Sequence, residues 1–189
     1  MKKTLSMLLA GAMLATALTG CGSSASTGSD SADNSTDSSA SGAAFKIGGT
    51  GPLTGENAIY GNACKNGAQI AVDEINAEGG DIQFELNYQD DEGDAEKAVN
   101  AYNALKDWGM QLSLGSVTSK PCEATAAENY SDRIFALTPS ASSVAVTEGK
   151  DNVFQMCFMD PNQGTASAQY IAEQKLGTKV AIIWKNDDV

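Results

Sequence analysis

Histidine is absent from the 189-residue chain, and basic residues are scarce, with 12 Lys and Arg against 24 Asp and Glu. Without His, a nucleophilic Ser or Cys would need Lys or a carboxylate as its base, and the sequence shows no such pairing. The formal net charge of −12 also argues against nucleic-acid binding, which uses Lys and Arg to neutralise phosphates. We therefore expect neither an enzyme nor a nucleic-acid-binding protein.

Complete cofactor and metal motifs are also missing. The Gly-rich stretch 48–55 carries Thr54 where a dinucleotide fingerprint needs its third Gly, and no Gly-Lys-Ser/Thr follows for a P-loop. The acidic residues between Asp90 and Asp94 miss the spacing of a Ca²⁺ loop and lie where acids cap a helix or face solvent. We expect no metal and no cofactor.

Cysteines are few, and those after Cys21 stand far apart, at Cys64, Cys122 and Cys157. Their spacing matches no zinc motif. Because three is an odd number, at least one thiol has no partner within this part of the chain. We expect three free thiols, with a Cys64–Cys122 disulfide as the alternative.

The chain has one long apolar run, residues 5–18, which follows Lys2 and Lys3. At about 14 residues it is shorter than the roughly 20 that span a bilayer, and it predicts a signal peptide over residues 1–20. The sequence Leu18-Thr19-Gly20-Cys21 resembles the bacterial lipobox. The resemblance implies lipidation of Cys21, an extracytoplasmic location, and membrane attachment through this anchor only.

Residues 22–44 are almost entirely Ser, Gly, Ala, Thr, Asp and Asn. Such a segment has little apolar surface to bury and is expected to remain flexible. We therefore assign residues 21–44 to the lipidated Cys and a linker. The remaining residues, 45–189, have the length of one ordinary domain.

Apolar periodicity after residue 44 alternates between strand and helix spacing. The pattern predicts helices from Tyr60 to the Gly pair at 79–80, from Asp94 to Gly109, around Pro121 to Asp132, and from Asp160 to Leu176. It predicts six strands, at residues 45–49, 82–88, 110–114, 134–137, 153–158 and 180–184. Strands joined by such helices pair in parallel through right-handed crossovers, so the fold class is α/β with a doubly wound sheet.

Ligands of doubly wound sheets bind beyond the carboxyl ends of the strands. Three loops rich in Gly, Ser or Thr are predicted at that edge, residues 49–60, 115–120 and 138–143. Ser119 lies at or near a helix start, where backbone N–H groups favour an anion. Together with Ser140 and Ser142 it could hold a carboxylate. A helix cap is the alternative role of Ser119.

An ordered series of short motifs gives the chain a family resemblance. It resembles the branched-chain amino-acid-binding proteins of bacterial ABC importers, the leucine/isoleucine/valine type of periplasmic binding protein. The motifs, in chain order, are Gly-Pro-Leu-Thr-Gly (51–55) with Tyr60-Gly61, Asn66-Gly67-Ala68, Asp73-Glu74-Ile75-Asn76, Tyr88-Gln89-Asp90-Asp91, Gly115-Ser116-Val117-Thr118-Ser119, Thr138-Pro139-Ser140-Ala141-Ser142 and Asp160-Pro161-Asn162-Gln163-Gly164.

The resemblance implies a two-lobed clamp that closes on a small amino-acid-like ligand and then docks on ABC permease subunits. Carried onto this chain, the residues that grip the ligand's carboxylate and ammonium are Ser119, Ser140 and Ser142. Thr118 and Ala141 would supply neighbouring backbone contacts. Tyr60 would be the aromatic residue beside the pocket, with packing at a helix start as its alternative role.

The resemblance also implies a division into lobes. Residues 45–160 would form the first, ligand-binding lobe, and residues 161–189 the incomplete start of the second, so the chain is read as a fragment. A disulfide found in some members would fall at Gly93 and Thr118 and is absent. The second lobe provides side-chain selectivity, so the ligand is expected only as a small amino acid or a related amide or carboxylate. A sensor ectodomain of the same fold is the alternative function.

Overall fold

The computed structural model describes residues 44–184. The signal peptide, Cys21 and most of the linker were predicted in residues 1–43, which lie outside the described residues, as do residues 185–189. All structural statements below concern residues 44–184.

A five-stranded parallel sheet forms the centre of the fold, with strand order β2-β1-β3-β4-β5. Its strands are β1 (Phe45–Gly51), β2 (Phe84–Asp90), β3 (Leu112–Ser113), β4 (Phe135–Thr138) and β5 (Val153–Gln155). The order reverses at β1, because β2 pairs on one side of it and β3 on the other. The predicted doubly wound α/β class is confirmed, and the switch point lies between β1 and β3.

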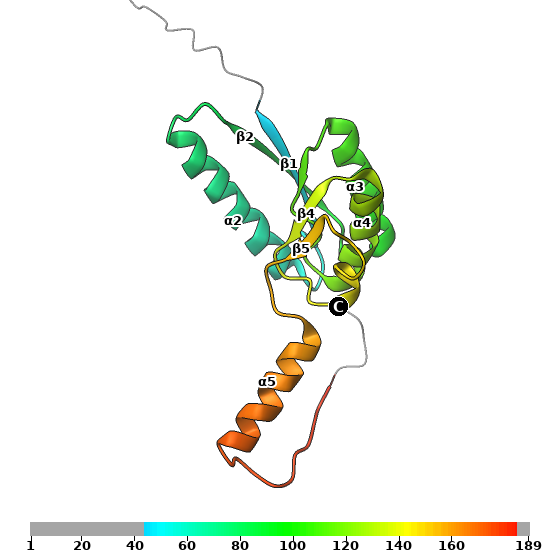
Figure 1. The fold of residues 1–189 in the computed structure, drawn as a ribbon. Helices are drawn as coiled ribbons and strands as arrows, with labels where there is room; N and C mark the ends of the chain where they lie inside the picture. Colours follow the sequence, from blue (N-terminus) through cyan, green and yellow to red (C-terminus); the bar gives the residue numbers. More distant parts are fainter. Residues whose placement is uncertain (1–43, 185–189) are drawn as a thin grey trace, which may run out of the picture. The chain divides into compact units, whose positions relative to one another are not determined.

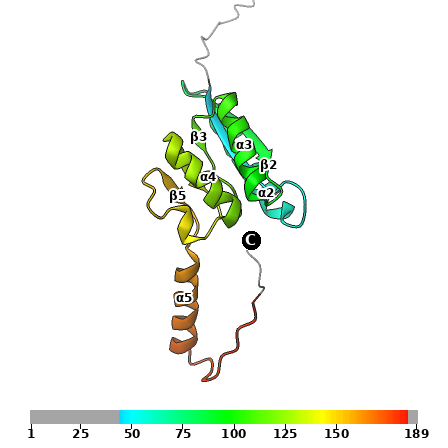
Figure 2. The same cartoon turned by 90° about the vertical axis from the view of Figure 1, so that its right-hand side faces the viewer.

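Helices cover both faces of this sheet. Figures 1 and 2 show α2 (Ala58–Ala77) on one face, and α3 (Ala95–Trp108) and α4 (Ser119–Asp132) on the other. The short 3₁₀ helix η1 (Val144–Val146) precedes β5, and α5 (Asp160–Glu173) follows it. No residue of α5 is buried.

Local sequence signals set the ends of α3 and α4. The Asp94 carboxylate accepts the Lys97 backbone N–H at 2.9 Å as the predicted cap of α3, and Gly109 ends that helix. The N-cap of α4 is Thr118, so Ser119 is the first helical residue and not the cap. In α5, Met159 is the N-cap and Asp160 the first helical residue, one position from the prediction.

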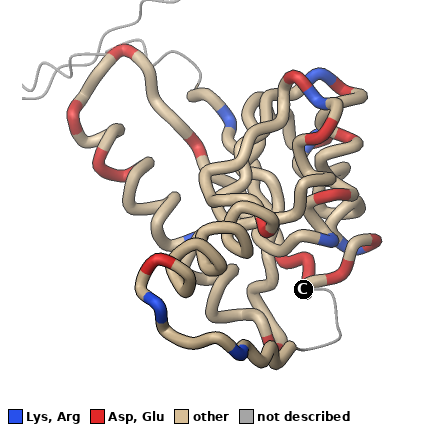
Figure 3. Tube along the Cα trace, turned by 60° about the horizontal axis from the view of Figure 1, so that its bottom comes forward, with Lys and Arg blue, Asp and Glu red and all other residues tan. Residues whose placement is uncertain are grey.

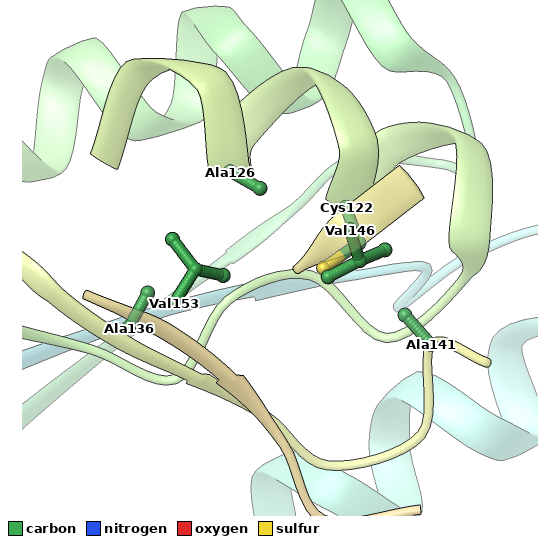
Figure 4. Close-up of a cluster of buried hydrophobic side chains, with 6 residues drawn as sticks. All are labelled: Cys122, Ala126, Ala136, Ala141, Val146 and Val153. Carbon is green, nitrogen blue, oxygen red and sulfur yellow. The ribbon is translucent and has the colours of Figure 1, made fainter. Parts of the chain in front are cut away.

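Two groups of buried side chains pack the face of the sheet that carries α3 and α4. Tyr102, Leu105 and Met110 form one group under α3. The other joins α4 to β4 and β5 and is shown in Figure 4; it comprises Cys122, Ala126, Ala136, Ala141, Val146 and Val153. Because these side chains are small, α4 lies close to the strands, which fixes the position of its first turn.

The opposite face, which carries α2, is less completely covered. Only Gly61 and Val72 of α2 are buried, and an apolar pocket of about 170 Å³ lies between this helix and the strands. Phe135 and Phe154 stack at 5.4 Å between ring centroids and remain exposed. Figure 3 shows Asp and Glu along the helices and loops, with fewer Lys and Arg among them.

The prediction of a sixth strand at residues 180–184 is wrong. These residues form no strand, and the side chains of Ile182 and Ile183 are exposed. A strand is stable only when a neighbour satisfies its N–H and C=O groups, and no described strand pairs with this segment. The helix before it is also shorter than predicted, because α5 ends at Glu173 and not at Leu176.

Candidate ligand-binding site

A pocket of about 280 Å³ opens at the carboxyl ends of the strands, beside the switch point. Its lining comes from the start of α2, from the loop between β3 and α4, and from the loop after β4. The lining residues are Tyr60, Val117, Thr118, Ser119, Ser140 and Ser142. The structure thus brings together five of the six predicted site residues, and it adds Val117, which was not predicted as a site residue.

Ser119 and Ser142 both line the pocket and are in direct contact. The Ser142 backbone N–H donates to the Ser119 hydroxyl at 3.3 Å. Because the Ser119 oxygen accepts this bond, its own proton remains for another acceptor. Ser119 also opens α4, where the helix dipole and the first backbone N–H groups favour a negative charge.

Ser140 has the opposite hydrogen-bonding state. Its hydroxyl donates to the Val117 carbonyl at 2.7 Å, which fastens the loop after β4 to the loop after β3. The oxygen of Ser140 therefore keeps its lone pairs for a donor. The pocket thus combines a hydroxyl that can donate with one that can accept, as a zwitterion requires.

Thr118 lies against the pocket with its hydroxyl oxygen buried and without a hydrogen-bond partner. An N-cap hydroxyl normally accepts from the second or third backbone N–H of its helix. The third residue of α4 is Pro121, which has no N–H. Pro121 thus removes one of the two N–H groups that the Thr118 hydroxyl could accept from, and α4 has no side-chain cap bond.

Ala141 is not part of the pocket lining. Its backbone N–H donates to the Thr138 hydroxyl at 3.2 Å, and its carbonyl accepts from Gln155 and Cys157. Because these backbone groups are occupied within the protein, Ala141 supports the loop that carries Ser140 and Ser142. A direct contact between Ala141 and a ligand stays a prediction.

Tyr60 reaches the pocket because α2 begins unusually close to the preceding loop. A Cβ atom on Gly61 would lie 2.0 Å from the Pro52 carbonyl oxygen, so only glycine permits this approach. The Tyr60 side chain itself is 59% exposed at the rim. Core packing therefore does not account for its position.

Asp90 holds the loop in front of Tyr60. Its carboxylate accepts the Leu53 backbone N–H at 2.8 Å and the Thr54 hydroxyl at 2.6 Å. Partial burial raises the pKa of Asp90, but these bonds and one from the Glu92 N–H outweigh that effect and lower the pKa below its usual range. Asp90, the last residue of β2, therefore fixes the loop that precedes α2 and Tyr60.

A row of buried hydroxyls lies within the described core behind the pocket lining. The Thr50 and Ser116 hydroxyl oxygens are 2.5 Å apart, and those of Ser116 and Thr125 are 3.1 Å apart. Next to Thr50, the fully buried Asp91 carboxyl accepts the Gly93 N–H at 2.9 Å. Burial raises the pKa of Asp91 to about 6, against the lowering effect of that bond and of the Thr50 hydroxyl.

The three cysteines of the described residues are free thiols, as predicted, and no Cys64–Cys122 disulfide forms. Cys122 is buried, whereas Cys64 and Cys157 are partly buried. Burial raises the pKa of each thiol above its usual range. All three are therefore poor nucleophiles near neutral pH.

Residues 44–184 contain no group of three or more His, Cys, Asp or Glu side chains arranged to hold a metal ion. Over the same residues, no helix has both the length and the apolar character needed to cross a bilayer.

A hydroxyl-lined pocket at the switch point of a parallel sheet is typical of a ligand-binding α/β lobe. Comparison with known proteins agrees with this class. Residues 44–189 match the family model described as periplasmic binding protein. The chain therefore belongs to the periplasmic binding protein family.

The chain is similar to the Leu/Ile/Val-binding protein BraC3 of Rhizobium johnstonii, with 37% identity over 72% of this chain and 38% of the relative. It is also similar in structure to the branched-chain amino acid transporter substrate binding protein LivJ from Streptococcus pneumoniae in complex with isoleucine. That match has a TM-score of 0.65 and 32% identity, over 70% of this chain and 39% of the other.

A third match is an ABC transporter substrate-binding protein from Desulfitobacterium hafniense in complex with Leu, with a TM-score of 0.59 and 27% identity. It covers 70% of this chain and 39% of the other. The chain thus spans about two fifths of the length of these relatives.

Proposed function

We propose that this chain is the front part of the extracytoplasmic solute-binding component of an ABC importer. Its ligand is a small amino acid of the branched-chain type, or a related amide or carboxylate. Family membership supports the class, and the names of the relatives, which include complexes with isoleucine and leucine, support the ligand. The role is capture and delivery of a solute, without a chemical reaction.

The observation that carries this proposal is the pairing of Ser119 and Ser142 at the start of α4. A carboxylate placed there would accept from the Ser119 hydroxyl and lie at the positive end of the helix dipole. The ammonium group of the same ligand would donate to the Ser140 oxygen. That oxygen can accept because the Ser140 hydroxyl already donates its own proton to the Val117 carbonyl. Tyr60 and Val117 would supply apolar contact.

The division into lobes follows from the same proposal. Residues 45–160 contain every residue that lines the pocket and form the first lobe, and residues 161–189 begin the second. In the complete protein the second lobe would close over the pocket, and the closed form would dock on permease subunits. The signal-like residues 1–20 and the lipobox-like Cys21 support anchoring of the protein to the outside of the cell membrane.

Thermal unfolding of the complete protein with a panel of amino acids tests the proposal. A true ligand at about a hundred times its dissociation constant adds roughly 2.7 kcal/mol to stability and raises the midpoint. We expect this shift with L-leucine, L-isoleucine or L-valine and none with L-lysine. A panel without any shift, in a protein that unfolds cooperatively, would contradict an amino-acid-binding role.

A further inference from the structure

The loop after β4 is held in place through its backbone by residues 155–160, a segment that begins at the end of β5. Three consecutive carbonyls of the loop, those of residues 141–143, accept hydrogen bonds from this segment. The Asp160 backbone N–H donates to the Ser142 carbonyl at 3.1 Å. Two of the other three bonds come from the side chain of Gln155.

Gln155 is the last residue of β5, and its side chain is partly buried. The amide nitrogen of this side chain donates to the Ala141 carbonyl at 2.7 Å and to the Ser143 carbonyl at 3.1 Å. These carbonyls belong to the residues on either side of Ser142. Because each bond needs one of the two amide protons, the NH₂ group of Gln155, and not its oxygen, faces the loop.

The amide oxygen of Gln155 has a partner of its own. Thr147, which follows η1 directly, donates its hydroxyl proton to this oxygen at 3.3 Å. If the amide turned over, its oxygen would face two carbonyl oxygens and its NH₂ group would leave both acceptors. The Thr147 hydroxyl therefore helps to fix Gln155 in the orientation in which it bonds to the loop.

The same loop meets the pocket on its other side. Figure 4 shows the Ala141 side chain among the buried residues that join α4 to the strands. The Ser142 N–H donates to the Ser119 hydroxyl, and the Ser140 hydroxyl donates to the Val117 carbonyl. A displacement of the loop would break both bonds. The position of the loop thus decides where the hydroxyls of the pocket lie relative to one another.

We propose that Gln155 is a positioning residue of the pocket, because its side-chain amide fixes the loop that presents Ser140 and Ser142. Gln155 is not part of the pocket lining and acts through this loop. A loop that is already ordered loses less entropy when a ligand binds, so loosening it weakens binding. The effect on affinity rests on the proposed function, whereas the effect on the loop is testable without a ligand.

The variant Gln155→Glu separates this role from packing, because the size of the side chain hardly changes. Near pH 7.5 the introduced carboxylate has no proton to donate and faces two carbonyl oxygens. Burial and these oxygens should raise its pKa above the ordinary value of about 4.3, so near pH 5 much of it is protonated and donates one bond. Gln155→Leu donates at neither pH. The matched control is Gln69→Glu, which loses an exposed bond on α2 with the same change of charge.

Amide hydrogen exchange of the ligand-free complete protein, followed by nuclear magnetic resonance, tests the effect on the loop. Relative to the wild type at the same pH, the Ser142 amide should exchange about tenfold faster in Gln155→Leu at both pH values. In Gln155→Glu the factor should be about ten near pH 7.5 and about three near pH 5. Gln69→Glu should match the wild type.

Amides of α3 should keep their wild-type exchange rates in all these variants, which distinguishes a loosened loop from a loss of global stability. A Ser142 amide that is unchanged, or that changes only together with the amides of α3, would overturn the proposal. Thr147→Val releases the Gln155 oxygen and replaces Gln155→Leu if that variant does not fold. It should speed Ser142 exchange about threefold, and a wild-type rate would count against the proposal.

Calorimetric titration with L-leucine tests the effect on affinity. We expect Gln155→Leu to bind about tenfold more weakly than the wild type at both pH values, and Gln155→Glu to recover to about threefold near pH 5. Wild-type affinity in both variants would overturn the role in the pocket. If L-leucine does not bind to the wild-type protein either, the proposed ligand is rejected, while the exchange of the Ser142 amide still decides whether Gln155 fixes the loop.

Discussion

Ser119 and Ser142 are 23 residues apart in sequence, yet the backbone N–H of Ser142 donates to the Ser119 hydroxyl at 3.3 Å. One residue opens α4 and the other follows β4, so the contact joins two loops at the carboxyl edge of the sheet. Because the Ser119 oxygen accepts this bond, its own proton remains for another acceptor.

Replacement of Ser119 by Ala removes the donor that the account assigns to the ligand carboxylate. A charge-assisted hydrogen bond contributes about 1.5–3 kcal/mol, so affinity should fall at least about tenfold. Calorimetric titration of the complete protein with L-isoleucine measures the change. The matched control is Ser131→Ala, an exposed serine near the other end of α4, which should bind as the wild type does. Equal affinities for the two variants would remove Ser119 from the site.

Gly61 and Gly67 make a matched pair on α2. An added Cβ at Gly61 would lie 2.0 Å from the Pro52 carbonyl oxygen, whereas at Gly67 no atom lies within 4 Å. Gly61→Ala should therefore destabilise the protein by about 1–3 kcal/mol and displace Tyr60. Gly67→Ala should stabilise it by up to about 1 kcal/mol through helix propensity. Urea unfolding measures both, and similar midpoints would show that α2 does not depend on this close approach.

Asp91 should make stability depend on pH in the mildly acidic range. Its folded pKa of about 6 lies above the ordinary value of 3.8, so between these values the folded state holds a proton that the unfolded state releases. This stabilisation is complete below the ordinary value and is lost as the pH rises through about 6.

The wild-type protein should therefore need less urea to unfold near pH 7.5 than near pH 5. Asp91→Asn should lose this dependence and be the more stable of the two near pH 7.5, since an Asn side-chain oxygen can still accept the Gly93 N–H. Identical pH profiles for the two proteins would show that Asp91 ionises without cost in the folded state.

The thiols should differ in their reactivity toward an aromatic disulfide reagent. Cys122 is buried and should react only when the protein unfolds. Cys64 and Cys157 are partly buried and have raised pKa values, so they should react slowly in the native state. Spectrophotometry of native and urea-unfolded protein separates the classes. Rapid reaction of Cys122 in native protein would contradict the packing of α4 against β4 and β5.

Much of the fold could be predicted because its signals are local. Short apolar runs and the alternation of residues 82–88 predicted the first five strands, and the Asp94 cap and Gly109 bounded α3 as expected. Strands separated by helices then fixed parallel pairing, which gave the edge where the pocket lies. Ser119, Ser140 and Ser142 could be named in advance because each follows a strand at that edge.

Features that depend on contacts between distant parts of the chain could not be predicted from the sequence. Residues 180–184 have the composition of a strand but form none, because no described strand pairs with them. The acidic run after β2 was read as a solvated turn. Its members differ: the Asp90 carboxylate accepts hydrogen bonds from Leu53 and Thr54, whereas the Asp91 carboxyl is buried and accepts the Gly93 N–H. Neighbouring residues of one type received different roles from tertiary contacts that no local pattern records.

A crystal structure of the complete protein with bound L-isoleucine tests the central claim most directly. The account predicts a ligand carboxylate oxygen within about 3 Å of the Ser119 hydroxyl, and the ligand ammonium near Ser140. A ligand bound elsewhere, or one that contacts the pocket only through its apolar side chain, would contradict the account.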